Sequence, residues 1–177
     1  MTPPGAGLAR MWAGWRDRYV QEAGTVASPA GTGCLFCALP AGADEDALVL
    51  ERTGTTFTVM NAFPYTSGHV MVAPLRHEPS FVGLGDDEAT GLIRAVRRAV
   101  AVVEEVYRPD GLNVGANLGR AAGAGVPGHL HVHVVPRWEG DTNFMTAVAE
   151  TRVLPETLGA GWARLREGFT RHRDGPA

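Results

Sequence analysis

Three histidines alternate with aliphatic residues in the segment His129-Leu130-His131-Val132-His133. Successive side chains on a β-strand point to opposite faces, so the three imidazoles would share one face while the aliphatic residues enter the core. A rise of about 3.3 Å per residue places successive rings roughly 6–7 Å apart. An imidazole can act as a nucleophile, transfer a proton or bind a metal ion. Three of them in register therefore indicate a reactive site.

Two kinds of chemistry fit this row of imidazoles. Strand-borne histidines can ligate zinc in a hydrolase, or one of them can attack phosphorus while its neighbours transfer protons. The preceding loop, residues 119–128, is rich in glycine and alanine. Small residues allow backbone N–H groups to approach phosphate oxygens closely, and we expect Gly123 and Gly125 to do so here. We therefore favour chemistry on phosphate and keep a zinc hydrolase as the alternative.

The composition excludes several other functions. All 16 basic residues are arginine, which removes P-loop and Schiff-base chemistry because both need a lysine. A net charge of −3 argues against a dedicated nucleic-acid-binding protein. The sequence has two cysteines, no signal peptide and no apolar run long enough to span a bilayer. We expect a cytoplasmic protein with no membrane segment and no organic cofactor.

Periodicity and turn residues predict the elements that must position the histidines. A long amphipathic helix is expected over 86–107, with Asp86 as its N-cap. Strand-like runs cover residues 47–51, 55–60, 69–74, 111–118 and 130–136. Strands on both sides of one long helix, joined by short turns, indicate an α+β protein with an antiparallel sheet of about five strands.

Both ends of the chain are expected to add a helix to this domain. Residues 1–33 are predicted to be an N-terminal extension with a helix over 8–21. Residues 34–177 suit one globular domain that ends in a helix over about 154–170.

The histidine segment and its surroundings resemble the histidine-triad (HIT) superfamily of nucleotide hydrolases and nucleotidyltransferases. Residues 128–137 are similar to its histidine motif, and residues 57–61 and 68–74 to its first hairpin. Residues 113–120 and 136–144 are similar to the actinobacterial diadenosine-tetraphosphate phosphorylase branch. The resemblance implies a homodimer that acts on a dinucleoside polyphosphate or a related nucleotide.

The resemblance also implies a role for individual residues. His131 would attack the α-phosphorus through Nε2 to give a nucleotidyl-histidine, while a backbone carbonyl holds its Nδ1–H. His133 would donate a proton near the leaving oxygen, and His69 would support the triad from a neighbouring strand. The implied substrate contacts are those of Asn61 with ribose, of Asn117 with a phosphoryl oxygen, and of Arg137 and Trp138 after the catalytic strand.

The phosphate loop departs from the family pattern. Many members carry Gln and Ser or Thr before the histidines, and the phosphorylase branch carries Gly-Ser, but residues 123–128 contain none of the three side chains. Loss of a hydrogen bond to a charged ligand costs about 1.5–3 kcal/mol. In a second step the nucleotidyl group would leave His131 for an acceptor. Inorganic phosphate, water and another group all stay open as that acceptor. A plain hydrolase of phosphoramidates or polyphosphates, and a non-catalytic nucleotide-binding protein, are the alternatives.

A pair of cysteines in Cys34-Leu35-Phe36-Cys37 is the second cluster of reactive residues. One C-x-x-C motif is compatible with zinc binding, redox chemistry or chance. In several HIT branches a similar pair forms a zinc site with two histidines, and the resemblance assigns His77 and His129 to that role. A Cys₂His₂ set would suit a structural zinc ion. His129 would then hold the loop while its neighbour performs the chemistry.

Overall fold

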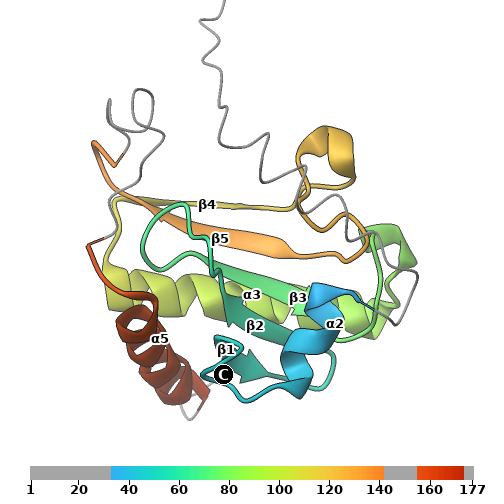
Figure 1. Cartoon of the computed structure of the whole chain (residues 1–177), viewed down its shortest axis with the longest axis horizontal. Coiled ribbons are helices and arrows are strands. Elements are labelled where there is room, and N and C mark those ends of the chain that lie inside the picture. Colours follow the sequence, from blue (N-terminus) through green and yellow to red (C-terminus); the bar gives the residue numbers. More distant parts are fainter. Residues whose placement is uncertain (1–32, 142–154, 174–177) are drawn as a thin grey trace, which may run out of the picture.

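The computed structural model describes residues 33–141 and 155–173 (Figure 1). The helix predicted over 8–21 lies outside the described residues. The helices and strands are α2 (Leu35–Ala38), β1 (Val49–Arg52), β2 (Thr56–Met60), β3 (Val70–Pro74), α3 (Asp86–Tyr107), β4 (Gly111–Gly115), β5 (Val132–Arg137) and α5 (Leu158–Arg173). Three short 3-10 turns complete them: η1 (Leu39–Ala41), η2 (Phe81–Gly83) and η3 (Arg120–Ala122).

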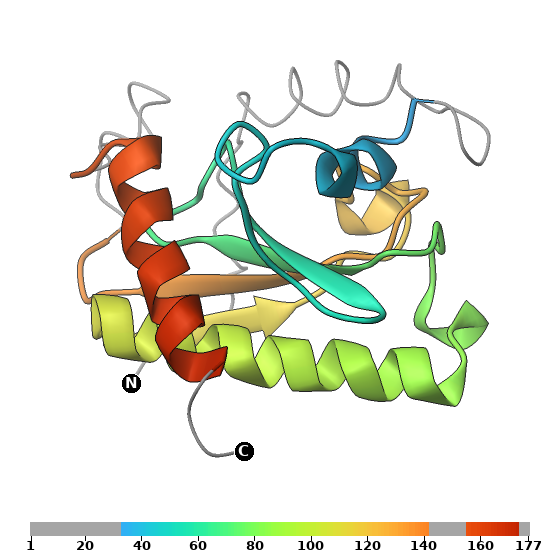
Figure 2. The same ribbon diagram turned by 90° about the horizontal axis from the view of Figure 1, so that it is seen from below.

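The five strands form one antiparallel sheet in the order β1-β2-β3-β5-β4. The long helix α3 lies along one face of this sheet and α2 lies over the other, while α5 packs against α3 and β1 (Figure 2). The prediction of an α+β fold with one long helix and a C-terminal helix is confirmed. None of the helices in the described ranges is long and apolar enough to cross a membrane.

Each face of the sheet has its own apolar cluster. The larger cluster joins inward residues of the strands, such as Val72 and Val134, to the buried stripe of α3 and to α5. The smaller one contains Phe36 of α2 together with residues of β1, β2 and β3 on the opposite face. Because side chains alternate along a strand, burying Val132 and Val134 under α3 leaves His133 on the α2 face. The smaller cluster therefore forms the floor of the candidate site.

The start of α3 differs by one residue from the prediction. Gly85 is the N-cap and Asp86 is the first helical residue. The carboxylate of Glu88 accepts a hydrogen bond from the backbone N–H of Gly85 at 2.9 Å, so the cap comes from the third helical residue. Asp86 contributes its negative charge to the first turn instead.

All five strands are shorter than predicted, and the differences in β3, β4 and β5 concern predicted site residues. β5 begins at Val132, because the backbone N–H of Leu130 donates to Glu78 (2.6 Å) in a loop outside the sheet. His129 and His131 therefore lie in the segment that enters the strand, and only His133 is on the strand itself. Similarly, β3 starts one residue after His69, and β4 ends at Gly115 rather than at residue 118.

Candidate functional site

His131 is buried, with 5% of its surface exposed, and the backbone fixes its tautomer. Its Nδ1 lies 2.8 Å from the carbonyl oxygen of His129. A carbonyl oxygen can only accept, so Nδ1 carries the hydrogen and Nε2 keeps its lone pair. Burial lowers the pKa of His131 below its ordinary value, so the ring is neutral at neutral pH. This is the hydrogen bond that the family resemblance implied, and it leaves Nε2 with a free lone pair.

A chain of hydrogen bonds also sets the tautomers of His69 and His133. The backbone N–H of Tyr65 donates to Nδ1 of His69 at 3.1 Å, so Nδ1 of that neutral ring carries no hydrogen. Nε2 of His69 then donates to Nδ1 of His133 at 2.9 Å. His133 consequently holds its hydrogen on Nε2. Burial first, and the charge of His131 second, lower the pKa of His133 to about 4.

The imidazole rings pack closer together than the strand rise suggests. The ring centroids of His131 and His133 are 5.0 Å apart with nearly perpendicular planes, and His69 lies 5.1 Å from His133. The spacing is shorter than 6–7 Å because His131 precedes the strand and is not held in its regular pleat. Tyr65 stacks on His133 with the centroids 6.1 Å apart. The rings form one continuous cluster.

The two cysteines meet the two predicted histidines. Sγ of Cys37 lies 3.3 Å from Nδ1 of His77 and 3.6 Å from Nδ1 of His129, and Sγ of Cys34 lies 3.5 Å from the latter. All four potential ligand atoms lie within 4.8 Å of one another. Nε2 of His129 donates to the carbonyl oxygen of Pro74 at 2.9 Å, which leaves the lone pair of Nδ1 facing the thiols. We call these four residues the Cys₂His₂ cluster.

The dimensions of the Cys₂His₂ cluster fit a tetrahedral zinc ion. Zn–S and Zn–N bonds of about 2.3 and 2.0–2.1 Å place a sulfur and a nitrogen ligand about 3.6 Å apart. The sulfur–nitrogen distances of 3.3–3.6 Å agree with this geometry. Burial, and next the hydrogen bond with the thiol of Cys34, raise the pKa of Cys37. A bound cation would stabilise the thiolates that burial disfavours.

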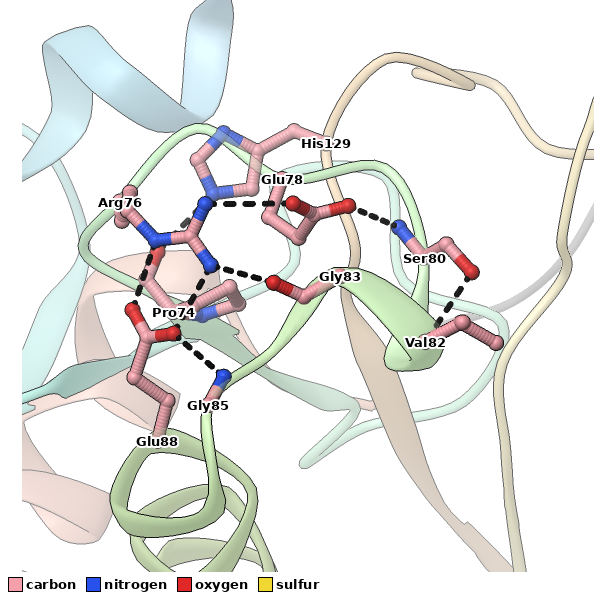
Figure 3. Close-up of polar contacts among 9 residues, drawn as sticks. All are labelled: Pro74, Arg76, Glu78, Ser80, Val82, Gly83, Gly85, Glu88 and His129. Carbon is pink, nitrogen blue, oxygen red and sulfur yellow. Dashed lines mark hydrogen bonds and ion pairs between the residues drawn. The ribbon is translucent and has the colours of Figure 1, made fainter.

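A layer of polar contacts holds the loop that carries His77 (Figure 3). Arg76 donates to both carboxylate oxygens of Glu88, each at 2.8 Å, and to the carbonyl oxygen of Gly83 at 2.7 Å. It also contacts the carboxylate of Glu78 at 3.2 Å, and the carbonyl of Glu78 accepts the backbone N–H of Leu130. The loop is thus tied to the start of α3 on one side and to the histidine segment on the other.

The sequence matches the family model described as the HIT domain over residues 43–140. The chain belongs to the HIT family. An AP-4-A phosphorylase of Mycobacterium tuberculosis is 40% identical over 154 residues, covering 85% of this chain and 79% of the relative. The asymmetrical bis(5'-nucleosyl)-tetraphosphatase of Schizosaccharomyces pombe is 36% identical over 106 residues, covering 60% of this chain and 56% of the relative.

Solved structures of HIT proteins share the fold. The crystal structure of a Zn-bound histidine triad family protein from Mycobacterium smegmatis has a TM-score of 0.63 and 26% sequence identity to this HIT chain. The alignment covers 79% of this chain and 95% of that structure. The family resemblance seen in the sequence is therefore confirmed by the family model, by relatives and by fold.

Two of the residues predicted to bind substrate have protein partners. Nδ2 of Asn61 lies 3.2 Å from Nδ1 of His69, and its Oδ1 accepts the backbone N–H of Phe63 at 2.9 Å. Arg137 donates to both carboxylate oxygens of Asp141, at 2.5 and 2.7 Å. It follows His133 by four strand residues, or about 13 Å along β5. Their contacts with a nucleotide stay predictions, and such contacts would add to these bonds or replace them.

The remaining residues predicted to contact substrate differ in their surroundings. Trp138 packs edge-on against Tyr107 at the end of α3, with the centroids 6.4 Å apart. The N–H of Gly123 donates to the carbonyl of Arg120 within the loop at 2.9 Å, so a phosphate contact of that N–H would compete with this bond. Asn117 and Gly125 are partly exposed in the same loop. The loop departs from the family pattern, and its contacts with phosphate stay predictions.

Sequence reasoning missed two aromatic residues that touch the histidines. Tyr65 positions His69 through its backbone N–H, and no sequence pattern reveals such a contact. Phe36 stacks on His131, with the centroids 4.6 Å apart. Its place between the two cysteines was the available signal.

Proposed function

We propose that this HIT protein cleaves dinucleoside polyphosphates, or related nucleotides, through a covalent nucleotidyl-His131. The observation that supports this most directly is the 2.8 Å hydrogen bond that holds Nδ1 of His131 and leaves Nε2 as the nucleophile. The names of two relatives, an AP-4-A phosphorylase and a bis(5'-nucleosyl)-tetraphosphatase, support the substrate class.

The first step of the proposed reaction is a displacement at the α-phosphorus. Nε2 of His131 forms an N–P bond while the bond from that phosphorus to the bridging oxygen breaks. The leaving nucleotide carries the negative charge of that oxygen. His133, whose hydrogen is on Nε2, would donate a hydrogen bond to that oxygen and stabilise its negative charge. His69 holds His133 in this tautomer, and we assign it a positioning role.

The second step transfers the nucleotidyl group from His131 to an acceptor. Attack by inorganic phosphate would release a nucleoside diphosphate, and attack by water would release a nucleoside monophosphate. In both cases the N–P bond breaks and the neutral imidazole returns. We propose phosphate as the acceptor, because the relative that is 40% identical is named a phosphorylase. The hydrolase is the second candidate, because the glycine loop departs from the family pattern.

We propose that the Cys₂His₂ cluster binds one structural zinc ion. The set of two sulfur and two nitrogen atoms and the distances between them suit that ion. The cluster would fix the segment that contains His129, whose carbonyl orients the nucleophile. Zinc would add folding free energy here and would not take part in the transfer.

We further propose a homodimer built on β4, the strand at one edge of the sheet. This edge is unpaired within the described chain and exposes Val114 (48%), and Leu118, three residues after the strand, is also exposed (46%). Size-exclusion chromatography with light scattering would test the assembly, and a monomer at micromolar concentration would contradict it. A cytoplasmic location stays a prediction.

The decisive experiment supplies diadenosine tetraphosphate with and without inorganic phosphate. Phosphorolysis predicts ADP only when phosphate is present, whereas hydrolysis predicts AMP in both reactions. Nucleotidyl-His131 should be trapped by acid-free denaturation and located by peptide mass spectrometry. Binding of the nucleotide without turnover and without a covalent intermediate would contradict both reactions and favour a non-catalytic nucleotide-binding protein.

A further inference from the structure

Phe36 lies against the proposed nucleophile. It occupies the middle of α2, is 1% exposed, and stacks on the ring of His131 with a centroid distance of 4.6 Å and an interplanar angle of 23°. It also packs against His129 at 5.5 Å and Phe57 at 6.3 Å, but those ring pairs are tilted. Among these three neighbours, only His131 presents its flat face to Phe36.

The stack restrains a motion that the hydrogen bond of His131 leaves open. The χ2 torsion of histidine is broad, so packing rather than intrinsic preference decides the plane of the ring. The bond from Nδ1 to the carbonyl of His129 fixes one atom of the ring. A flat side chain parallel to the imidazole then limits its tilt, and the two contacts together fix the direction in which Nε2 points.

The Cys₂His₂ cluster holds Phe36 in turn. α2 is only four residues long and has no side-chain cap, so its own hydrogen bonds contribute little stability. Phe36 lies between Cys34 and Cys37, and both thiols contact imidazoles of the cluster. The same contacts that would hold a metal ion therefore restrain the backbone on both sides of Phe36.

We propose that Phe36 is a positioning residue for the nucleophile and that the Cys₂His₂ cluster orients His131 through it. This inference rests on the proposed function, because it assumes that His131 forms a covalent intermediate. A displacement of about 1 Å in a reacting group can slow a reaction by about 100-fold. Loss of the stack should accordingly act on the rate of nucleotidyl transfer more than on the affinity for the nucleotide.

The test compares Phe36→Leu with Phe57→Leu as a matched control. Both substitutions replace a buried phenyl ring of the same apolar cluster with an aliphatic side chain, but Phe57 is tilted toward Phe36 and is not paired with His131. The rate of nucleotidyl-enzyme formation is measured in a single turnover, and the affinity for a non-hydrolysable dinucleotide by calorimetry. We expect Phe36→Leu to slow the step by roughly 10- to 100-fold with the affinity within about threefold. Phe57→Leu should leave the rate within about twofold.

Each outcome has one meaning. A rate for Phe36→Leu equal to that of the wild type, or an equal loss in Phe57→Leu, would overturn the positioning role while leaving the covalent mechanism in place. Absence of any nucleotidyl-enzyme in the wild type would instead overturn the proposed function. Should Phe36→Leu not fold, Phe36→Met, which fills the space with a flexible side chain, serves the same comparison.

A double-mutant cycle tests the link to the metal cluster. Cys37→Ser should slow nucleotidyl transfer in the wild-type background but add little to the defect of Phe36→Leu, because the cluster acts through the ring. Zinc content, measured for all four proteins, verifies that Cys37→Ser weakens metal binding and that Phe36→Leu retains the ion. Fully multiplicative losses would show that the cluster and the ring act separately, which contradicts the inference.

Discussion

Replacing Gly68 with alanine should destabilise the fold and displace the histidine cluster through the backbone. Gly68 has a φ of +78°, and a Cβ at this position would lie 2.6 Å from Cε2 and 2.7 Å from Cδ2 of Tyr107. The left-handed conformation costs alanine about 1–2 kcal/mol relative to glycine. Overpacking against this partly buried ring costs about 1–3 kcal/mol more. The free energy of unfolding should therefore fall by about 2–5 kcal/mol, which lowers Tm by roughly 10 °C in a chain of this size.

A matched control separates these two contributions. Gly140 has a similar φ of +75°, but a Cβ there would meet no atom within 4 Å. Gly140→Ala should therefore show the conformational cost alone, about 1–2 kcal/mol. Urea unfolding of both variants gives their free energies of unfolding, and the difference between the two losses is the cost of the contact with Tyr107. Equal losses of stability in the two variants would refute this reasoning.

Gly68→Ala should also slow catalysis, because Gly68 directly precedes His69. Nε2 of His69 is held 2.9 Å from His133, and a shift that relieves the clash with Tyr107 would lengthen this bond. We expect nucleotidyl transfer to slow by about tenfold or more at a temperature where the variant is folded. An unchanged rate in Gly68→Ala would show that the position of His69 does not depend on this turn.

Four further predictions concern the same site. His131→Ala should abolish nucleotidyl transfer while leaving nucleotide affinity within a few-fold, and retained turnover would contradict the mechanism. Metal analysis should find about one zinc per chain, and Cys34→Ser combined with Cys37→Ser should remove it; equal zinc in the double variant would refute the metal site. The lowered pKa of His133, about 4 against 6.5, means that the unfolded chain binds more protons between these values. Stability should therefore fall by up to about 3 kcal/mol as pH drops from 6.5 to 4, and His133→Gln should flatten this slope in urea unfolding. The pKa of Glu88 is lowered to about 2, first by its hydrogen bond with Arg76. Its stabilising effect is therefore present above pH 4.5 and is lost as pH falls toward 2. Glu88→Gln should remove that pH dependence, and an unchanged dependence of stability on pH in the acid range would contradict the ion pair.

Hydrophobic periodicity was enough to predict the main elements of the fold. The bounds 86–107 of the long helix agree with α3, because the signals that mark them are local: an apolar stripe along the helix, and Pro109, Asp110 and Gly111 directly after it. The start of β5 was not predictable, because the N–H of Leu130 pairs with Glu78, about fifty residues away in the chain. Local sequence carries no information about such a partner.

The candidate site shows the same division between local pattern and three-dimensional contact. The row of histidines indicated the reactive segment, and family resemblance supplied His77 as a partner for the cysteines, which lie about forty residues away in sequence. The contact of Phe36 with His131 depends on how α2 packs against the sheet. The sequence pattern marked the cysteines on both sides of this ring, and that position was the available local signal, but it did not reveal which histidine the ring would contact.

Backbone groups, rather than charged side chains, assign the tautomers of these imidazoles. The carbonyl of Pro74 fixes His129, the carbonyl of His129 fixes His131, and the N–H of Tyr65 fixes His69, which in turn fixes His133. Carbonyl and N–H groups do not titrate, so the arrangement persists wherever the rings are neutral. A carboxylate partner would instead stabilise the protonated imidazole and raise its pKa, which would lower the fraction of rings that keep a free lone pair at neutral pH. With neutral rings, the negative charge in the proposed reaction enters with the phosphates of the substrate, and lysine is not needed to balance a second anion from the protein.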